Sequence, residues 1–196
     1  MNFIGGVGAI VGGVIGGVIG LLLIIFVIWL VSTYNNFVRL KNAIEEAFST
    51  MDVYLKKRYD LVPNFVETVK GYAKHEKETL EKVIAARNAC ATAGSTEDKM
   101  ENEARLTSVL KQLSVVIEKY PELKADKNFI ELQNTLKNLE NEIAASRKYY
   151  NGIVKQYNTK REVFPSNLIA KMFNFDKKPL YEVDSAKERK NVKVEF

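Results

Sequence analysis

Hydrophobic and polar residues are distributed in two unlike ways along this chain. Residues 1–38 carry no charged side chain, and residues 3–31 are all apolar or glycine. From Arg39 onward, charged residues alternate densely with apolar ones. Because about 20 apolar residues suffice for a helix to cross a hydrocarbon core about 30 Å thick, the first part is predicted to be a single transmembrane helix.

The charged part of the chain shows helical periodicity almost throughout. Apolar residues recur at steps of three and four in four stretches, residues 37–58, 65–90, 106–120 and 129–157. Pro63 is expected to kink or break the first helix near residues 60–64. The only strand-like alternation is Val192, Val194 and Phe196 at the end. The fold class is therefore predicted to be all-α, an N-terminal transmembrane helix followed by an antiparallel four-helix bundle of long helices.

These patterns divide the chain into three predicted segments. They are a glycine-rich transmembrane anchor (residues 1–33), a helical bundle (34–173) that includes a short helix at 167–173, and an extended C-terminal tail (174–196). No Lys or Arg precedes the apolar run and no small-residue cleavage site ends it, which argues against a signal peptide.

The flanks of the apolar run predict its orientation. Basic residues follow the run, at Arg39 and Lys41, and none precedes it. Since Lys and Arg beside a span stay cytoplasmic, the N-terminus is expected outside and the C-terminal domain in the cytoplasm. Trp29 and Tyr34 are candidate aromatic anchors at the inner interface.

Small residues form two adjacent rows along the first half of the span. In lipid, such rows let helix backbones approach closely, and two rows allow each helix to touch two neighbours. A homo-oligomer larger than a dimer is one interpretation; a helix end that is merely less hydrophobic or bent is the other. The candidate packing residues are Gly8, Gly12, Gly13, Gly16, Gly17 and Gly20.

Four charged residues fall at core-facing positions of the predicted helices. Glu76 and Arg87 lie on the second stripe, and Glu140 and Arg147 on the fourth. Burying one such charge alone costs several kcal/mol, so a paired, buried polar layer is expected, one that sets helix register rather than performing chemistry.

The residues required for common catalytic and metal sites are absent from the sequence. One histidine, His75, and one cysteine, Cys90, are too few for a di-iron site or the usual zinc sites, and a common nucleophile pair would have to rely on His75 alone. No cofactor is expected. Most basic residues alternate with acidic ones, which is typical of solvated helix faces and argues against nucleic acid. Lys56, Lys57 and Arg58, with the lysines of the tail, are candidates for contact with anionic lipid headgroups.

Six short motifs lie along the chain, namely RYDLVPN at 58–64, VKGY at 69–72, EKYPELKA at 118–125, ENEIA at 140–144, FPSN at 164–167 and VEF at 194–196. Together they resemble the LemA family of bacterial membrane proteins. The resemblance implies a four-helix cytoplasmic domain behind one membrane helix in the bacterial inner membrane, and no established enzymatic activity. The glycine-rich start is longer than the usual anchor, and Phe48 stands where tryptophan is common.

Two functional hypotheses follow from the sequence. The first is a non-enzymatic scaffold whose oligomerised anchors array helical bundles on the inner face of the membrane. The second is a membrane-tethered adaptor that binds an unidentified protein or a small ligand through the bundle, with the four charged core positions as the recognising layer. The membrane lipid is the expected partner in both.

Overall fold

The computed structural model describes the backbone of residues 3–181 and the side chains of residues 12–181, and this part of the chain is helical without strands. This confirms the all-α prediction; the strand-like alternation at 192–196 lies outside the described residues. The helices are α1 (Phe3–Tyr72), α2 (Lys77–Thr92), α3 (Thr96–Ile117), α4 (Pro121–Ala125), α5 (Lys127–Glu162) and α6 (Ser166–Met172).

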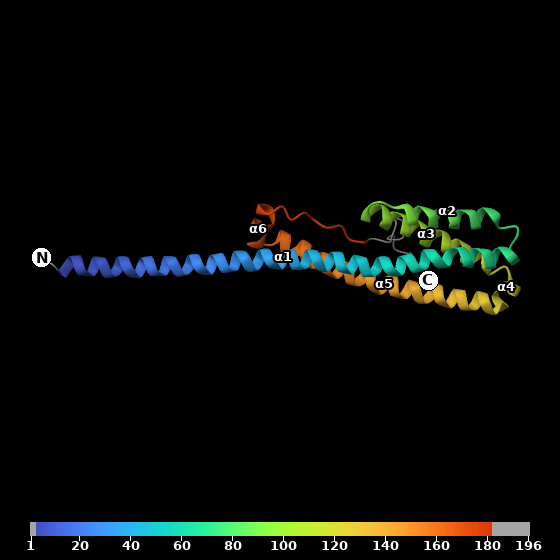
Figure 1. Ribbon diagram of the computed structural model, residues 1–196, viewed down its shortest axis with the longest axis horizontal. Helices are drawn as coiled ribbons and strands as arrows, with labels where there is room; N and C mark the ends of the chain where they lie inside the picture. The colour runs from blue at the N-terminus through green and yellow to red at the C-terminus, as the bar shows by residue number, and fades with distance from the viewer. Residues whose placement is uncertain (1–2, 182–196) are drawn as a thin grey trace, which may run out of the picture. The chain divides into compact units, whose positions relative to one another are not determined.

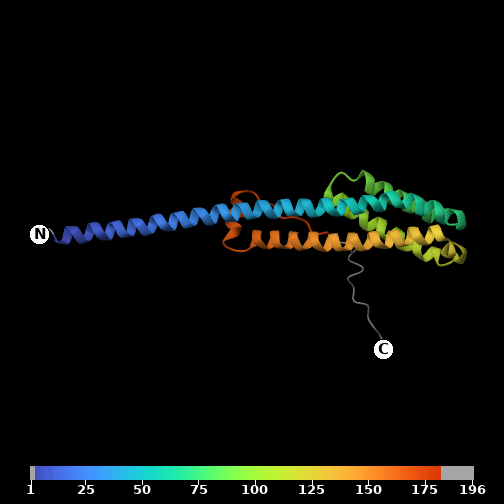
Figure 2. The ribbon, with the colours of Figure 1, turned by 60° about the horizontal axis from the view of Figure 1, so that its bottom comes forward.

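Helix α1 is continuous from the apolar run into the bundle (Figures 1 and 2). The expected break near residues 60–64 is wrong, because Pro63 lies inside the helix. A proline has no N–H to donate to the carbonyl four residues earlier, here that of Tyr59. The Nε of Arg87 donates to this carbonyl at 3.1 Å. A side chain from α2 thus replaces the missing bond of α1, and the chain first turns after Tyr72.

The later helix starts follow from local capping. Ser95 accepts a hydrogen bond from the Asp98 amide at 3.0 Å and caps α3. Asp126 accepts from the Phe129 amide at 2.8 Å at the start of α5, and the Tyr72 hydroxyl donates to its other oxygen at 2.9 Å. The amide and then the hydroxyl lower the pKa of Asp126. This aspartate joins the start of α5 to the end of α1.

The chain forms two compact units. The first comprises Met1–Ala43 and Val154–Lys178, the second Ile44–Ile153 and Pro179–Phe196, so α1 and α5 each contribute to both. In the second unit, α2 and α3 lie beside α1 and α5 in both views (Figures 1 and 2). Its core contains Val62, Phe65, Val66, Val69, Ala73, Leu80, Val83, Leu113, Ile117, Leu123 and Phe129.

Aromatic side chains form the core of the first unit. Phe37 is fully buried, stacks on Phe175 with ring centroids 4.8 Å apart and meets the edge of Tyr157 at 5.8 Å. Tyr34 lies 4.7 Å from the Phe173 ring. The segment that follows α6 is therefore held against the part of α1 around residues 34–37.

The bond between Arg87 and the Tyr59 carbonyl predicts coupling between Arg87 and Pro63. Arg87→Met should lower the free energy of unfolding by about 1–3 kcal/mol, because a largely buried carbonyl loses its donor. In a Pro63→Ala background the cost should fall, since the backbone amide of the introduced alanine can satisfy the same carbonyl. Urea unfolding of the full chain in detergent, followed by circular dichroism, measures this double-mutant cycle. A coupling energy near zero, rather than at least about 1 kcal/mol, would contradict the assignment.

Candidate functional site

A buried ion layer crosses the core of the second unit. Arg58 on α1 is fully buried and forms an ion pair with Glu103 on α3, which is 1% exposed. Its Nη1 also donates to Glu140 on α5 at 2.5 Å and to the Thr107 hydroxyl at 3.3 Å. Three helices are therefore held in one register by a single guanidinium, because an unpaired charge here would be costly.

The structure places the four predicted charged residues at separate points. Glu140 joins the Arg58 layer, and Arg87 bonds the Tyr59 carbonyl. Glu76 accepts from the Tyr120 hydroxyl at 3.2 Å, while Arg147 lies over the Tyr181 ring at 4.7 Å. Among the described residues, no hydrogen bond or ion pair joins any two of these four. The layer is organised instead by Arg58 and Glu103, which sequence reasoning missed.

Both missed residues lie on apolar stripes that the sequence displays. Arg58 follows Met51 and Leu55 at helical spacing, and Glu103 stands three residues from both Met100 and Leu106. Glu103 belongs to an acidic stretch at 97–103, which resembles a solvated helix face. Arg58 adjoins Lys56 and Lys57, and this grouping predicts a headgroup contact. That grouping is wrong for Arg58, which solvent and lipid cannot reach.

A second polar cluster surrounds Tyr181. Asn151 on α5 accepts from the Tyr181 amide at 2.8 Å and donates to its carbonyl at 3.0 Å, which fixes the backbone of the extended segment. Among the described residues, the Tyr59 and Tyr181 hydroxyls and the Nε of Arg147 are buried and have no hydrogen-bond partner. Burial raises the pKa of both tyrosines and lowers the pKa of Arg147.

Cys90 is the one cysteine of the chain and is 2% exposed. Burial raises the pKa of its thiol to about 11, so the thiolate is scarce at neutral pH. Over residues 12–181, no three or more His, Cys, Asp or Glu side chains are grouped to hold a metal ion. Cys90 thus packs as a small apolar residue.

Two hollows lie on the surface of the second unit. A cleft of about 520 Å³ beside the ion layer is lined by Phe65, Thr107 and Glu140, with Gln133, Asn134 and Lys137 among its polar residues. A groove of about 860 Å³ between α1 and α2 has Val66, Leu80 and Ile84 in its walls, with lysines at positions 70, 74 and 77. Only the cleft touches the buried polar layer, through Glu140 and Thr107.

The apolar part of α1 has no neighbour in the described chain. An 18-residue window of this helix has a mean hydropathy of 3.1 and no buried residue, so the helix is long and apolar enough to cross a membrane. A side-chain carbon built on Gly12, Gly13, Gly16, Gly17 or Gly20 would meet nothing within 4 Å. Gly8 lies outside the residues whose side chains are described. Both small-residue rows are thus unoccupied surfaces of the single chain from Gly12 onward.

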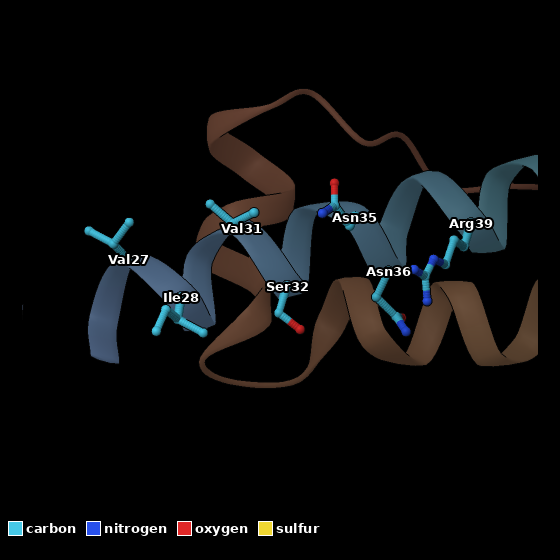
Figure 3. A pocket seen from close by; sticks show the side chains of 7 residues that line it. All are labelled: Val27, Ile28, Val31, Ser32, Asn35, Asn36 and Arg39. Atoms are coloured by element: carbon cyan, nitrogen blue, oxygen red, sulfur yellow. The ribbon is translucent and has the colours of Figure 1, made fainter. Parts of the chain in front are cut away.

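The two predicted interface anchors differ in their surroundings. The Trp29 ring lies 5.8 Å from that of Phe26 on the same helix, whereas Tyr34 packs against Phe173 and Phe175. A separate hollow of about 450 Å³ along α1 is lined by other residues of this helix (Figure 3). Its lining changes from apolar to polar along the helix, in the order Val27, Ile28, Val31, Ser32, Asn35, Asn36 and Arg39.

Comparison with known proteins confirms the family resemblance. The model of the LemA family matches residues 47–196. A relative called "Protein LemA" from Metamycoplasma hominis (strain ATCC 23114) is 28% identical over 147 residues, which cover 74% of this chain and 67% of the relative. The match includes α2 to α6 and the part of α1 that enters the second unit.

The buried ion layer predicts unequal effects of single and double substitutions. Arg58→Met should lower the free energy of unfolding by about 3–5 kcal/mol, because Glu103 is left buried without its partner. Arg58→Met combined with Glu103→Leu should recover most of this loss, since no buried charge remains; Glu140 is partly exposed and can be solvated. Urea unfolding in detergent measures both variants.

An exposed ion pair provides the control for this comparison. Lys82 and Glu78, 2.6 Å apart, are both largely exposed, so Glu78→Ala should leave the unfolding midpoint unchanged. If the double variant is no more stable than Arg58→Met, the loss of stability in Arg58→Met does not come from the unpaired charge of Glu103.

Proposed function

The chain belongs to the LemA family, and we propose that it is a non-enzymatic, single-pass membrane protein of the bacterial inner membrane that acts as a homo-oligomeric scaffold. Its α1 spans the bilayer with the N-terminus outside, and the helical bundle lies on the cytoplasmic side. The apolar helices assemble into an oligomer larger than a dimer, and this assembly arrays the bundles along the membrane.

The open glycine rows are the observation that carries this proposal. Gly12, Gly16 and Gly20 follow one row, Gly13 and Gly17 the adjacent row, and none of them faces another part of the described chain. Without a hydrophobic driving force inside lipid, helices associate by close backbone packing, which such rows allow. Two rows on one helix can contact two neighbours, which extends an assembly beyond a pair.

The chemistry of the bundle agrees with a scaffold. Its buried charges pair with one another across three helices and thereby fix packing. Cys90 is buried and has a raised thiol pKa, so it lacks the environment of a nucleophile. Other molecules would therefore contact the second unit at its surface.

The cleft beside Glu140 favours a second candidate function, an adaptor that binds a small polar ligand or a protein through the bundle. Arg58 bonds one oxygen of Glu140, and the Glu140 side chain is 40% exposed. A ligand at this position could act on the register of α1, α3 and α5. An adaptor of this kind would be monomeric in mild detergent, whereas the scaffold would be a large homogeneous particle.

The glycine rows predict the outcome of a leucine substitution experiment. Replacing Gly12, Gly13, Gly16 and Gly17 by Leu should abolish oligomers larger than a dimer, because leucine side chains hold the backbones apart. Crosslinking in native membranes and mass measurement in mild detergent provide the readout. The matched control replaces Val14, Ile15, Val18 and Ile19 by Leu in the same turns and should retain the oligomer. Unchanged oligomers in the glycine variant would contradict the scaffold.

The proposed orientation predicts a labelling pattern. In a Cys90→Ala background, a membrane-impermeant maleimide should label Asn2→Cys in intact cells and Tyr149→Cys only after lysis. Tyr149 is 65% exposed in the second unit, so folding does not hide it. The reverse pattern would place the bundle outside.

A further inference from the structure

We propose that residues 163–173, which contain the turn after α5, α6 and Phe173, form a second membrane-binding element that inserts into the cytoplasmic lipid surface. The basic residues of the first unit bind anionic lipid headgroups at the same surface. This rests on the proposed span of α1. The partner is the lipid surface itself.

An unpartnered apolar face is the first observation. Leu168 is 55% exposed and Met172 57%, and their spacing of four places them on one side of α6; Phe164, in the turn just before α6, is 79% exposed. Val163 and Phe173 are also large, apolar and exposed. The opposite side is anchored, since Ile169 and Ala170 are buried and the Ser166 hydroxyl donates to the Lys160 carbonyl at 2.6 Å.

The position of this face along α1 is the second observation. The ring contact between Phe173 and Tyr34, and that between Phe175 and Phe37, hold the element at residues 34–37 of α1. This level lies between the exposed apolar residues 21–28 and Arg39, the first charged residue of the chain. Since the hydrocarbon core ends where charge begins, the element lies at the depth of the headgroups.

The distribution of charge is the third observation. The first unit contains eight basic and two acidic residues, out of 29 and 24 in the chain, which leaves 21 and 22 for the second unit. The basic excess of the protein therefore resides entirely in the unit that carries the span. The residues are Arg39, Lys41, Lys155, Lys160, Arg161, Lys171, Lys177 and Lys178 against Glu162 and Asp176.

Apolar insertion beside positive charge matches the chemistry of an interfacial lipid-binding helix. Anionic headgroups attract basic residues that lie within a Debye length of the surface. A protein partner at this face would have to occupy the headgroup region, where lipid is already present. These three observations favour lipid as the occupant.

Spin labels on the full chain in vesicles test the insertion. In a Cys90→Ala background, a nitroxide at Leu168→Cys should be several-fold more accessible to oxygen than to a water-soluble nickel complex. Val115→Cys provides the matched control, because Val115 is 68% exposed in α3 of the second unit, and its label should show the opposite preference. A label at Leu168→Cys that prefers nickel, or that neither reagent reaches, would overturn the proposal.

A label within the span separates this proposal from the proposed function. Ile24→Cys should prefer oxygen strongly, since Ile24 is 60% exposed on the apolar part of α1. If Ile24→Cys prefers nickel, the span itself is wrong. If Ile24→Cys prefers oxygen and Leu168→Cys does not, only the second membrane element is wrong.

Spin-labelled lipids test the headgroup contacts. The protein should restrict labelled phosphatidylglycerol about twofold more than labelled phosphatidylcholine. Lys155→Gln with Lys171→Gln should reduce this preference, whereas Lys137→Gln with Lys148→Gln, two exposed lysines of the second unit, should leave it unchanged. Equal restriction of both lipids, or equal effects of the two double variants, would overturn the basic contribution.

Discussion

The continuity of α1 is the constraint on which the rest of the structure depends. One helix supplies the apolar run, the aromatic contacts of the first unit and Arg58 in the second. Any break between these parts would separate the later helices from the apolar run. Pro63 would ordinarily introduce such a break, and the bond from Arg87 to the Tyr59 carbonyl shows how it is avoided. A side chain of α2 therefore stabilises the helix that precedes it.

The buried charges of the bundle fix the register of α1 against α3 and α5. A hydrophobic core alone tolerates sliding of long helices past one another, whereas a buried guanidinium accepts few alternative partners. Arg58 contacts Glu103 on α3 and Glu140 on α5 from its position on α1, so a shift of one helix turn in any of the three would leave a buried charge unpaired. The energetic cost of that state, rather than the net strength of the pairs, is what makes the layer specific.

Much of this fold is predictable from periodicity, and the failures have physical causes. The apolar run, the later stripes and the break before α6 follow from local sequence. The behaviour of Pro63 does not, because it depends on Arg87 from another helix. Glu103 and Arg58 lie on visible stripes, but an exposed and a buried charge look alike until the partner is known. The bonds from Asn151 to the Tyr181 backbone carry no periodic signal at all.

The net charge of the whole chain is a poor description of either unit. A balance of +5 would ordinarily indicate attraction of the bundle to anionic surfaces. The second unit, with 21 basic and 22 acidic residues, has almost no net charge by itself. Its net charge therefore produces no long-range attraction to anionic lipid or nucleic acid. The excess lies instead in the unit that contains the long apolar part of α1. The basic excess and the long apolar part of α1 therefore lie in the same unit, and the second unit has neither.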